Sequence, residues 1–176
     1  FFVEAIEKVG IVEQQAERNE YIVREVISYK NEETGSEITV IPANEYQVTT
    51  MVDFGTKILG TQNAYMNTLS EFKADIASAR TFSFLHELEV LLDRGLIKGG
   101  DLNNAIIYVD KEPSAETMDK LKKVFNRDNV TVKPNGVLDN ITLHYSNEAA
   151  RHKLLDVVGD LALVGVRKGD CQQAWS

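Results

Sequence analysis

Cysteine is almost absent from this sequence: the 176 residues include one, Cys171, close to the C-terminal end. One cysteine cannot form an intrachain disulfide, so the chain is not a disulfide-stabilised secreted scaffold, and a reducing compartment suits it best. Long apolar runs are also lacking, since none reaches the roughly 18 residues that a membrane-spanning helix needs. We therefore expect a cytoplasmic protein with no integral membrane segment.

Positive charge is in short supply as well. Nineteen Lys and Arg residues face 27 Asp and Glu residues, which gives a net charge of −8. This sign is wrong for a protein that binds the nucleic-acid backbone, although a local positive pocket could still hold an anionic ligand. A hydrophobic content of 43% is enough for one globular domain or slightly more. The chain opens inside an apolar pattern at Phe1, so we expect it to be a piece of a longer protein.

The stretch at 148–165, EAARHKLLDVVGDLALVG, predicts one buried helix. Ser146 is a suitable N-cap, Glu148 suits the first turn, and Gly165 follows the last periodic position. The apolar residues are too many for a solvated helix, which predicts packing around most of its circumference. They are Leu154, Leu155, Val158, Leu161 and Leu163.

Charged residues interrupt this apolar helix. His152 and Asp156 are four residues apart and share one face, with Asp160 a turn further along. A buried carboxylate has to be paired or bound to a metal. One interpretation is an ordinary ion pair, joined by Lys153 or Arg151. The other is part of a zinc site, because imidazole nitrogen and carboxylate oxygen are zinc ligands. The spacing alone leaves both open.

The remaining elements predict an α+β fold. We expect two layers, in which helices pack on one face of a largely antiparallel sheet, with an inserted β-α-β unit. The expected helices lie at 2–9, after the capping-box pattern at 68–71, at 83–94 and from residue 114. The expected strands lie at 21–29, 38–41, 46–52, 105–109, 130–132 and 141–143.

Three separated motifs together resemble one family. They are RTFSF at 80–84, GLIKGG at 95–100 followed by NAI at 104–106, and RHKLLD at 151–156 followed by GDL at 159–161. In this order they resemble the second domain of the zinc-dependent UDP-3-O-acyl-N-acetylglucosamine deacetylase, a hydrolase of lipid A biosynthesis in Gram-negative bacteria. The resemblance implies a preceding domain's tail at 1–15, the second domain at 16–169 with its insert at 80–109, and a non-matching tail at 170–176.

The resemblance also assigns catalytic and metal-binding roles. His152 and Asp156 resemble two of three protein ligands of the catalytic Zn2+, with water as the fourth ligand. Asp160 resembles the carboxylate that orients a catalytic histidine. Lys153 resembles the lysine that binds the substrate. Thr81 resembles the hydroxyl donor that stabilises the oxyanion formed when water adds to the acetamide.

Substrate contacts follow from the same resemblance. Phe54 and Phe82 resemble aromatic residues that bind the substrate, Phe54 at its uridine end. The insert resembles one whose apolar channel holds the acyl chain of the UDP-linked acylated glucosamine. The residues expected to line it are Leu85, Leu88, Ile97, Gly100, Leu102, Ala105 and Ile107. The apolar pattern alone favours an ordinary core over a channel, and it is the resemblance that favours the channel.

Parts of the family pattern are missing from the sequence. The family's third zinc ligand and general-base glutamate lie upstream of Phe1. Its catalytic histidine lies in a Gly-His segment downstream of Gly165, where residues 167–172 contain no histidine. The other histidines, His86 and His144, suit surface or capping positions. We therefore expect weak zinc binding through two ligands and no turnover by this chain alone.

Two further expectations concern partners and function. In the variety of the family that this chain most resembles, the deacetylase is fused to an acyl-carrier dehydratase domain, so the full-length protein could carry that fusion. The alternative function is non-enzymatic: an α+β domain that binds a nucleotide-sugar or acyl ligand, in which His152 and Asp156 form a structural pair.

Overall fold

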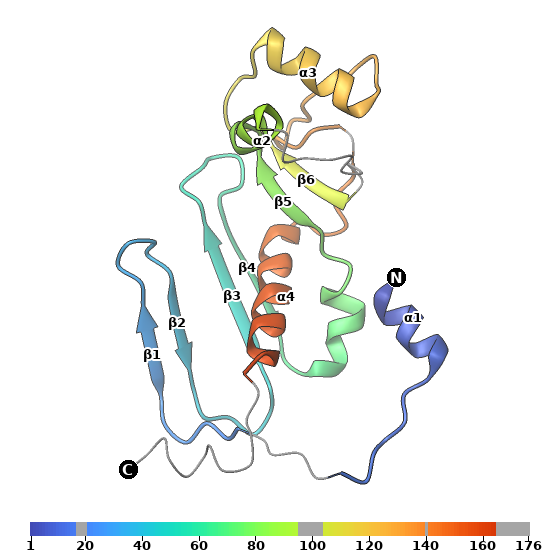
Figure 1. Ribbon diagram of the computed structural model, residues 1–176. Helices are drawn as coiled ribbons and strands as arrows, with labels where there is room; N and C mark the ends of the chain where they lie inside the picture. Colours follow the sequence, from blue (N-terminus) through green and yellow to red (C-terminus); the bar gives the residue numbers. More distant parts are fainter. Residues whose placement is uncertain (17–20, 95–103, 140, 165–176) are drawn as a thin grey trace.

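A computed structural model describes residues 1–16, 21–94, 104–139 and 141–164 (Figure 1). The described residues form a mixed α+β fold, which confirms the predicted class. The elements are α1 (Phe2–Val9), β1 (Ile27–Lys30), β2 (Glu37–Val40), β3 (Val48–Asp53), β4 (Thr61–Met66), the 3-10 helix η1 (Leu69–Glu71), the π-helix η2 (Phe72–Ile76), β5 (Thr81–Phe84), α2 (Leu85–Asp93), β6 (Ala105–Tyr108), α3 (Ala115–Phe125) and α4 (Glu148–Ala162). None of the helices in these ranges is long and apolar enough to span a membrane.

Strands in the described ranges pair two by two. The pairs β1–β2 and β3–β4 are antiparallel, and β5–β6 is parallel. The strand predicted at 46–52 is present as β3, but its partner β4 was not predicted. The β4 sequence TQNAYM is mostly polar, and only Ala64 and Met66 are buried. Two buried residues give too weak an alternation to be recognised in isolation.

Helix α4 lies across β3 and β4 in Figure 1 and packs on them. Its Ala150 and Leu154 are fully buried in a cluster with Val48, Ala64, Met66 and Ile76. The prediction of packing around most of the helix is wrong for its C-terminal end, because Leu161 is 36% and Leu163 is 82% exposed. The N-cap is Asn147 instead of Ser146, and its side chain makes no capping bond.

The predicted β-α-β unit is present as β5, α2 and β6, and residue Thr81 pairs with Ala105 in its parallel ladder. Apolar residues cover both faces of this pair, as parallel strands require. The cluster on one face contains Phe84, Ile106, Tyr108 and Ala149 of α4. The cluster on the other contains Leu85, Ile107, Val109 and Leu121 of α3.

The strands predicted at 130–132 and 141–143 are wrong. Val132 makes only a single bridge, with Leu138, and residues 141–143 have neither a strand nor a bridge. A second isolated bridge joins Tyr108 to Val137. Residues 134–136, between these two runs, form a turn, and Gly136 has a φ of +73°. Its carbonyl accepts a hydrogen bond from the Val109 N–H at 2.8 Å. Runs of three residues are too short for a ladder unless a neighbouring strand supplies the partner, and here only single contacts form.

Candidate functional site

His152 lies on the first half of α4 with its side chain only 17% exposed. Its Nδ1 is 3.2 Å from the carbonyl oxygen of Ala79, which precedes β5. A carbonyl oxygen can only accept a hydrogen bond, so Nδ1 must carry the hydrogen. In the neutral ring the lone pair therefore resides on Nε2, the atom left available to a ligand.

Asp156 faces this nitrogen. Its Oδ1 is 3.6 Å from His152 Nε2, and its Oδ2 accepts a hydrogen bond from Lys153 Nζ at 3.0 Å. Because Nδ1 carries the hydrogen of the neutral ring, Nε2 and Oδ1 are both acceptors. Two acceptors attract each other only when a positive group lies between them. That group is a proton in an imidazolium–carboxylate pair or a cation bound by both atoms. The geometry therefore suits both interpretations of the sequence.

Among the residues that the structure describes, no third metal ligand accompanies this pair. In the ranges that the structure describes, no three His, Cys, Asp or Glu side chains gather closely enough to hold a metal ion. Asp160 follows on the same helix and is exposed. As predicted, His86 and His144 lie at the surface, with side chains 49% and 48% exposed.

The turn after β3 positions Phe54. The preceding Asp53 accepts hydrogen bonds from the Gly55 N–H at 2.8 Å and from Thr61 Oγ1 at 2.7 Å. The Gly55 N–H, followed by the Thr61 hydroxyl, lowers the pKa of Asp53 below its ordinary value. Gly55 has a φ of +65°, which permits this tight turn. The turn thus fixes the backbone on both sides of Phe54.

Aromatic rings connect Phe54 to the helix. Its ring centroid is 5.3 Å from that of Phe82 in an edge-to-face arrangement. Lys153 Nζ lies 5.6 Å from the Phe82 ring centroid, within the range of a cation–π contact. The structure therefore brings together three predicted substrate-binding residues from β5, α4 and the β3–β4 turn, next to Asp156.

Thr81 and the described residues of the predicted acyl channel lie in β5, α2 and β6. Thr81, the first residue of β5, is exposed and follows Ala79 by two residues. Leu85 and Ile107 are buried and pack against Leu121 of α3, whereas Leu88 and Ala105 are partly buried. This packing gives Leu85 and Ile107 a place in the core, and their role in a channel stays a prediction. The predicted channel residues Ile97, Gly100 and Leu102 lie outside the described residues.

Sequence reasoning missed a buried ion pair beside this site. The Glu148 side chain is fully buried, and its Oε1 accepts a hydrogen bond from Arg80 Nε at 2.8 Å. Burial, followed by the negative charge of Glu148, raises the pKa of the nearby Tyr108 to about 12. The sequence offered two separate signals, the arginine of the RTF motif and an acid in the first turn of the last helix. The two residues are 68 positions apart, and no spacing rule pairs them.

The chain is similar to proteins of one known family. The family model described as "LpxC: UDP-3-O-acyl N-acetylglycosamine deacetylase" matches residues 1–172. The chain belongs to the LpxC family. It is 41% identical to the "Bifunctional enzyme LpxC/FabZ" of Bacteroides thetaiotaomicron over 165 residues, 94% of this chain and 36% of that protein. It is 34% identical to the "UDP-3-O-acyl-N-acetylglucosamine deacetylase" of Thermosynechococcus vestitus, over 93% of this chain and 48% of that protein.

Membership in the LpxC family confirms the resemblance carried by the three motifs. The chain spans between about a third and a half of the length of these LpxC relatives. The family match extends through residue 172 and includes residues 1–15, which we assigned to a preceding domain. The domain boundaries and the role of each site residue stay predictions. Residues 167–172, where the family's histidine is missing, lie outside the described residues.

Proposed function

We propose that this chain forms part of the active site of a zinc-dependent deacetylase, which hydrolyses the acetamide of UDP-3-O-acyl-N-acetylglucosamine in lipid A biosynthesis. The observation that carries the proposal is the orientation of His152. Its Nδ1–H is held by the Ala79 carbonyl and its Nε2 faces Asp156 Oδ1 at 3.6 Å. A histidine whose second nitrogen donates to a backbone carbonyl is the usual arrangement of a metal ligand.

The residues present fit zinc in part. Imidazole Nε2 and carboxylate oxygen are donors that zinc accepts, but catalytic sites normally use three protein ligands. The described residues supply two, so we expect weak binding by this chain alone. When bound, zinc supplies an activated water and polarises the carbonyl of the amide.

The chain's own residues have separate tasks in this proposal. Lys153 offers a cation to the diphosphate or sugar and is kept near Phe82 by Asp156. Phe54 and Phe82 present aromatic surface to the substrate, with Phe54 43% exposed at the uridine end. Thr81 donates its hydroxyl to the oxyanion that forms at the acetamide carbonyl. Asp160 orients a catalytic histidine.

The proposal extends to the whole protein. Relatives from Bacteroides thetaiotaomicron and Porphyromonas gingivalis are both named bifunctional LpxC/FabZ enzymes, and each is 41% identical to this chain. We propose that the full-length protein likewise carries a fused dehydratase domain and acts in the cytoplasm of a Gram-negative bacterium. The net charge of −8 agrees with a small-molecule substrate in place of nucleic acid.

A second candidate is a non-enzymatic domain that binds a nucleotide-sugar or acyl ligand. It is favoured by one observation: the 3.6 Å separation of His152 and Asp156 also suits a plain ion pair, with no metal involved. The aromatic surface and Lys153 would serve such a domain equally well. The two candidates differ in whether His152 holds a metal.

Zinc titration calorimetry on this chain separates them, with His86→Ala as the matched control. His86 also pairs with a carboxylate, Asp110, at 3.1 Å. We expect weak zinc binding by the unaltered chain, its loss in His152→Ala with the fold intact, and its retention in His86→Ala. A large fall in stability of His152→Ala, with no zinc bound by either protein, favours the ion pair. Micromolar or tighter binding with turnover by the chain alone contradicts the two-ligand expectation.

Acetate release provides the catalytic readout of the same test. The protein for this assay is a hybrid of the Bacteroides thetaiotaomicron relative, in which this chain replaces the 165 residues that it matches. We expect the hybrid to release acetate from UDP-3-O-acyl-N-acetylglucosamine. His152→Ala should reduce kcat/KM by about 100-fold or more, because mutating a residue that only hydrogen-bonds to a metal ligand already reduces metal affinity or activity by about 10- to 100-fold. An unchanged rate in His152→Ala removes this residue from the proposed site.

A further inference from the structure

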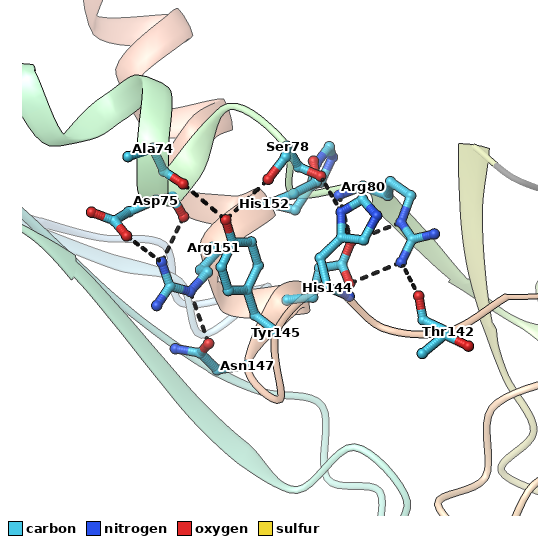
Figure 2. Close-up of polar contacts among 12 residues, drawn as sticks. Ala74, Asp75, Ser78, Arg80, Thr142, His144, Tyr145, Asn147, Arg151 and His152 are labelled. Carbon is cyan, nitrogen blue, oxygen red and sulfur yellow. Dashed lines mark hydrogen bonds and ion pairs between the residues drawn. The ribbon is translucent and has the colours of Figure 1, made fainter.

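The carboxylate of Glu148 holds the chain segment that leads into β5. It accepts hydrogen bonds from Arg80 at the backbone N–H (3.1 Å), at Nε (2.8 Å) and at Nη2 (3.1 Å). The His144 N–H adds a fourth bond at 2.7 Å. Arg80 Nη2 also donates to the Thr142 carbonyl at 2.7 Å. Figure 2 shows Arg80 between the labelled Thr142 and His144. Both oxygens of the buried carboxylate thus accept hydrogen bonds, as a buried charge requires.

This grip lies next to the contact that orients His152. Glu148 and His152 are four residues apart on α4 and so lie on one face of the helix. The groups that they hold, the Arg80 N–H and the Ala79 carbonyl, belong to adjacent residues. The position of the Ala79 carbonyl therefore depends on Arg80 remaining attached to Glu148.

Resting on the proposed function, we propose that the Arg80–Glu148 pair is the positioning device for the zinc ligand His152. It holds the Ala79 carbonyl where it captures the Nδ1–H of His152, which fixes the tautomer and directs Nε2 toward the metal. The same pair sets the start of β5, so that Thr81 follows directly from the anchored residue. Arg80 and Glu148 act through their neighbours and do not touch the reacting atoms.

A second ion pair to the same segment provides a matched control. Arg151 Nη1 lies 4.0 Å from Asp75 Oδ1, and the Asp75 side chain is 53% exposed. Arg151 Nη1 also donates a hydrogen bond to the Asp75 backbone carbonyl at 2.6 Å, and a change of the Asp75 side chain leaves this bond in place. Exposed pairs contribute little to stability. Asp75→Asn therefore removes a charge from the segment without loosening it.

The test is the tautomer of His152, read from long-range proton–nitrogen NMR correlations of chain labelled with ¹⁵N-histidine, without metal at neutral pH. We expect the unaltered chain to show the Nδ1–H tautomer. In Glu148→Gln, the His152 signals should shift toward a mixture that contains the Nε2–H tautomer. Zinc affinity should fall by about 10-fold or more. Asp75→Asn should resemble the unaltered chain.

General loss of stability is controlled by Leu121→Ala, a cavity variant in the cluster under α3, away from His152. It should unfold more easily yet keep the Nδ1–H tautomer. If Glu148→Gln does not fold, Arg80→Lys replaces it, because lysine keeps the charge but cannot form the fork to both carboxylate oxygens. Retention of the Nδ1–H tautomer in the folded variant overturns the proposal, as does the same shift in Leu121→Ala.

The outcome separates this inference from the deacetylase proposal. If the His152 tautomer changes as expected but the chain binds no zinc and the hybrid enzyme releases no acetate, the positioning role stands and the deacetylase proposal fails. If zinc binding and acetate release are found but the His152 tautomer is unchanged in Glu148→Gln, the deacetylase proposal stands and the positioning role fails.

Discussion

Glu148 shows how one side chain connects stability to the site. Burial on its own would raise the pKa of this carboxyl group, but the hydrogen bonds from Arg80 and His144, with the positive charge of Arg80, lower it below its ordinary value. The carboxylate is therefore charged in the folded protein at neutral pH. Removing one partner of a buried pair typically costs about 3–5 kcal/mol, because the other charge is left unpaired.

The first prediction at this scale concerns acid. The pKa of Glu148 is lower in the folded than in the unfolded chain. The ionised carboxylate therefore stabilises the folded protein at pH values above the pKa of the unfolded state, about 4.3. This stabilisation is lost as the pH falls through the pKa of the folded state. We expect Glu148→Gln to lower the free energy of unfolding by about 3 kcal/mol at pH 7. The difference from the unaltered chain should narrow below about pH 4.3.

Urea denaturation at a series of pH values from 7 to 3 measures that difference. Asp75→Asn, at an exposed carboxylate, serves as the control and should track the unaltered chain closely. A difference between Glu148→Gln and the unaltered chain that stays constant across the whole series contradicts the assigned pKa direction.

At the scale of elements, the turn before residue 137 determines how β6 is covered. Gly136 is buried, has a φ of +73°, and lies so close to Ile58 that an added Cβ would overlap that side chain. The Val109 N–H donates to its carbonyl, and the Leu138 N–H donates to Ile107. This turn thus joins the β5–β6 pair to the Ile58 region next to Phe54.

We predict that Gly136→Ala destabilises the protein by about 2–5 kcal/mol, from left-handed backbone strain of about 1–2 kcal/mol and overpacking of about 1–3 kcal/mol. Gly35→Ala is the control, since Gly35 has a φ of +69° but open space around its Cβ position. It should show the strain alone. Thermal or urea unfolding of both variants, and of Gly136→Ala with Ile58→Ala, measures the two contributions. Equal losses at Gly136 and Gly35 would rule out the contact with Ile58.

Element types were predicted well wherever one local pattern was enough. Helices α1, α2, α3 and α4 and the strand–helix–strand insert follow from periodicity and capping residues. Strand β4 was missed because its burial depends on α4, which arrives more than 80 residues later and covers Ala64 and Met66. Conversely, the run at 130–132 has strand-forming residues but no neighbouring strand, and it makes a single bridge.

At the scale of the molecule, the described residues differ widely in burial. In the hairpin of β1 and β2, every residue of β1 is exposed and Val40 is partly buried. The β3–β4 pair, in contrast, lies under α4, and Thr50 Oγ1 donates to the Ala150 carbonyl at 3.0 Å. Local opening requires less free energy where little apolar surface is buried.

We therefore predict that backbone amides of β1 and β2 exchange with deuterium at least about 10-fold faster than those of β3 and β4 at the same pH. Hydrogen exchange followed by NMR measures this directly. Equal protection of the two pairs would mean that the hairpin is covered in solution.

The sequence by itself determined the local arrangements of this LpxC family member. The spacing of His152 and Asp156 places them on one helix face wherever the helix lies, because a turn takes 3.6 residues. The order of the three motifs likewise indicates the family without any tertiary contact. These relations need only neighbouring residues along the chain.

The tertiary structure decided which distant groups meet. It placed Ala79 against His152 Nδ1, Glu148 against Arg80, and Phe54 against Phe82. Each contact joins segments brought together by burial of the cores under α4 and beside β5–β6. Because the hydrophobic effect is non-directional, no residue spacing encodes these partners. They follow from how whole elements pack.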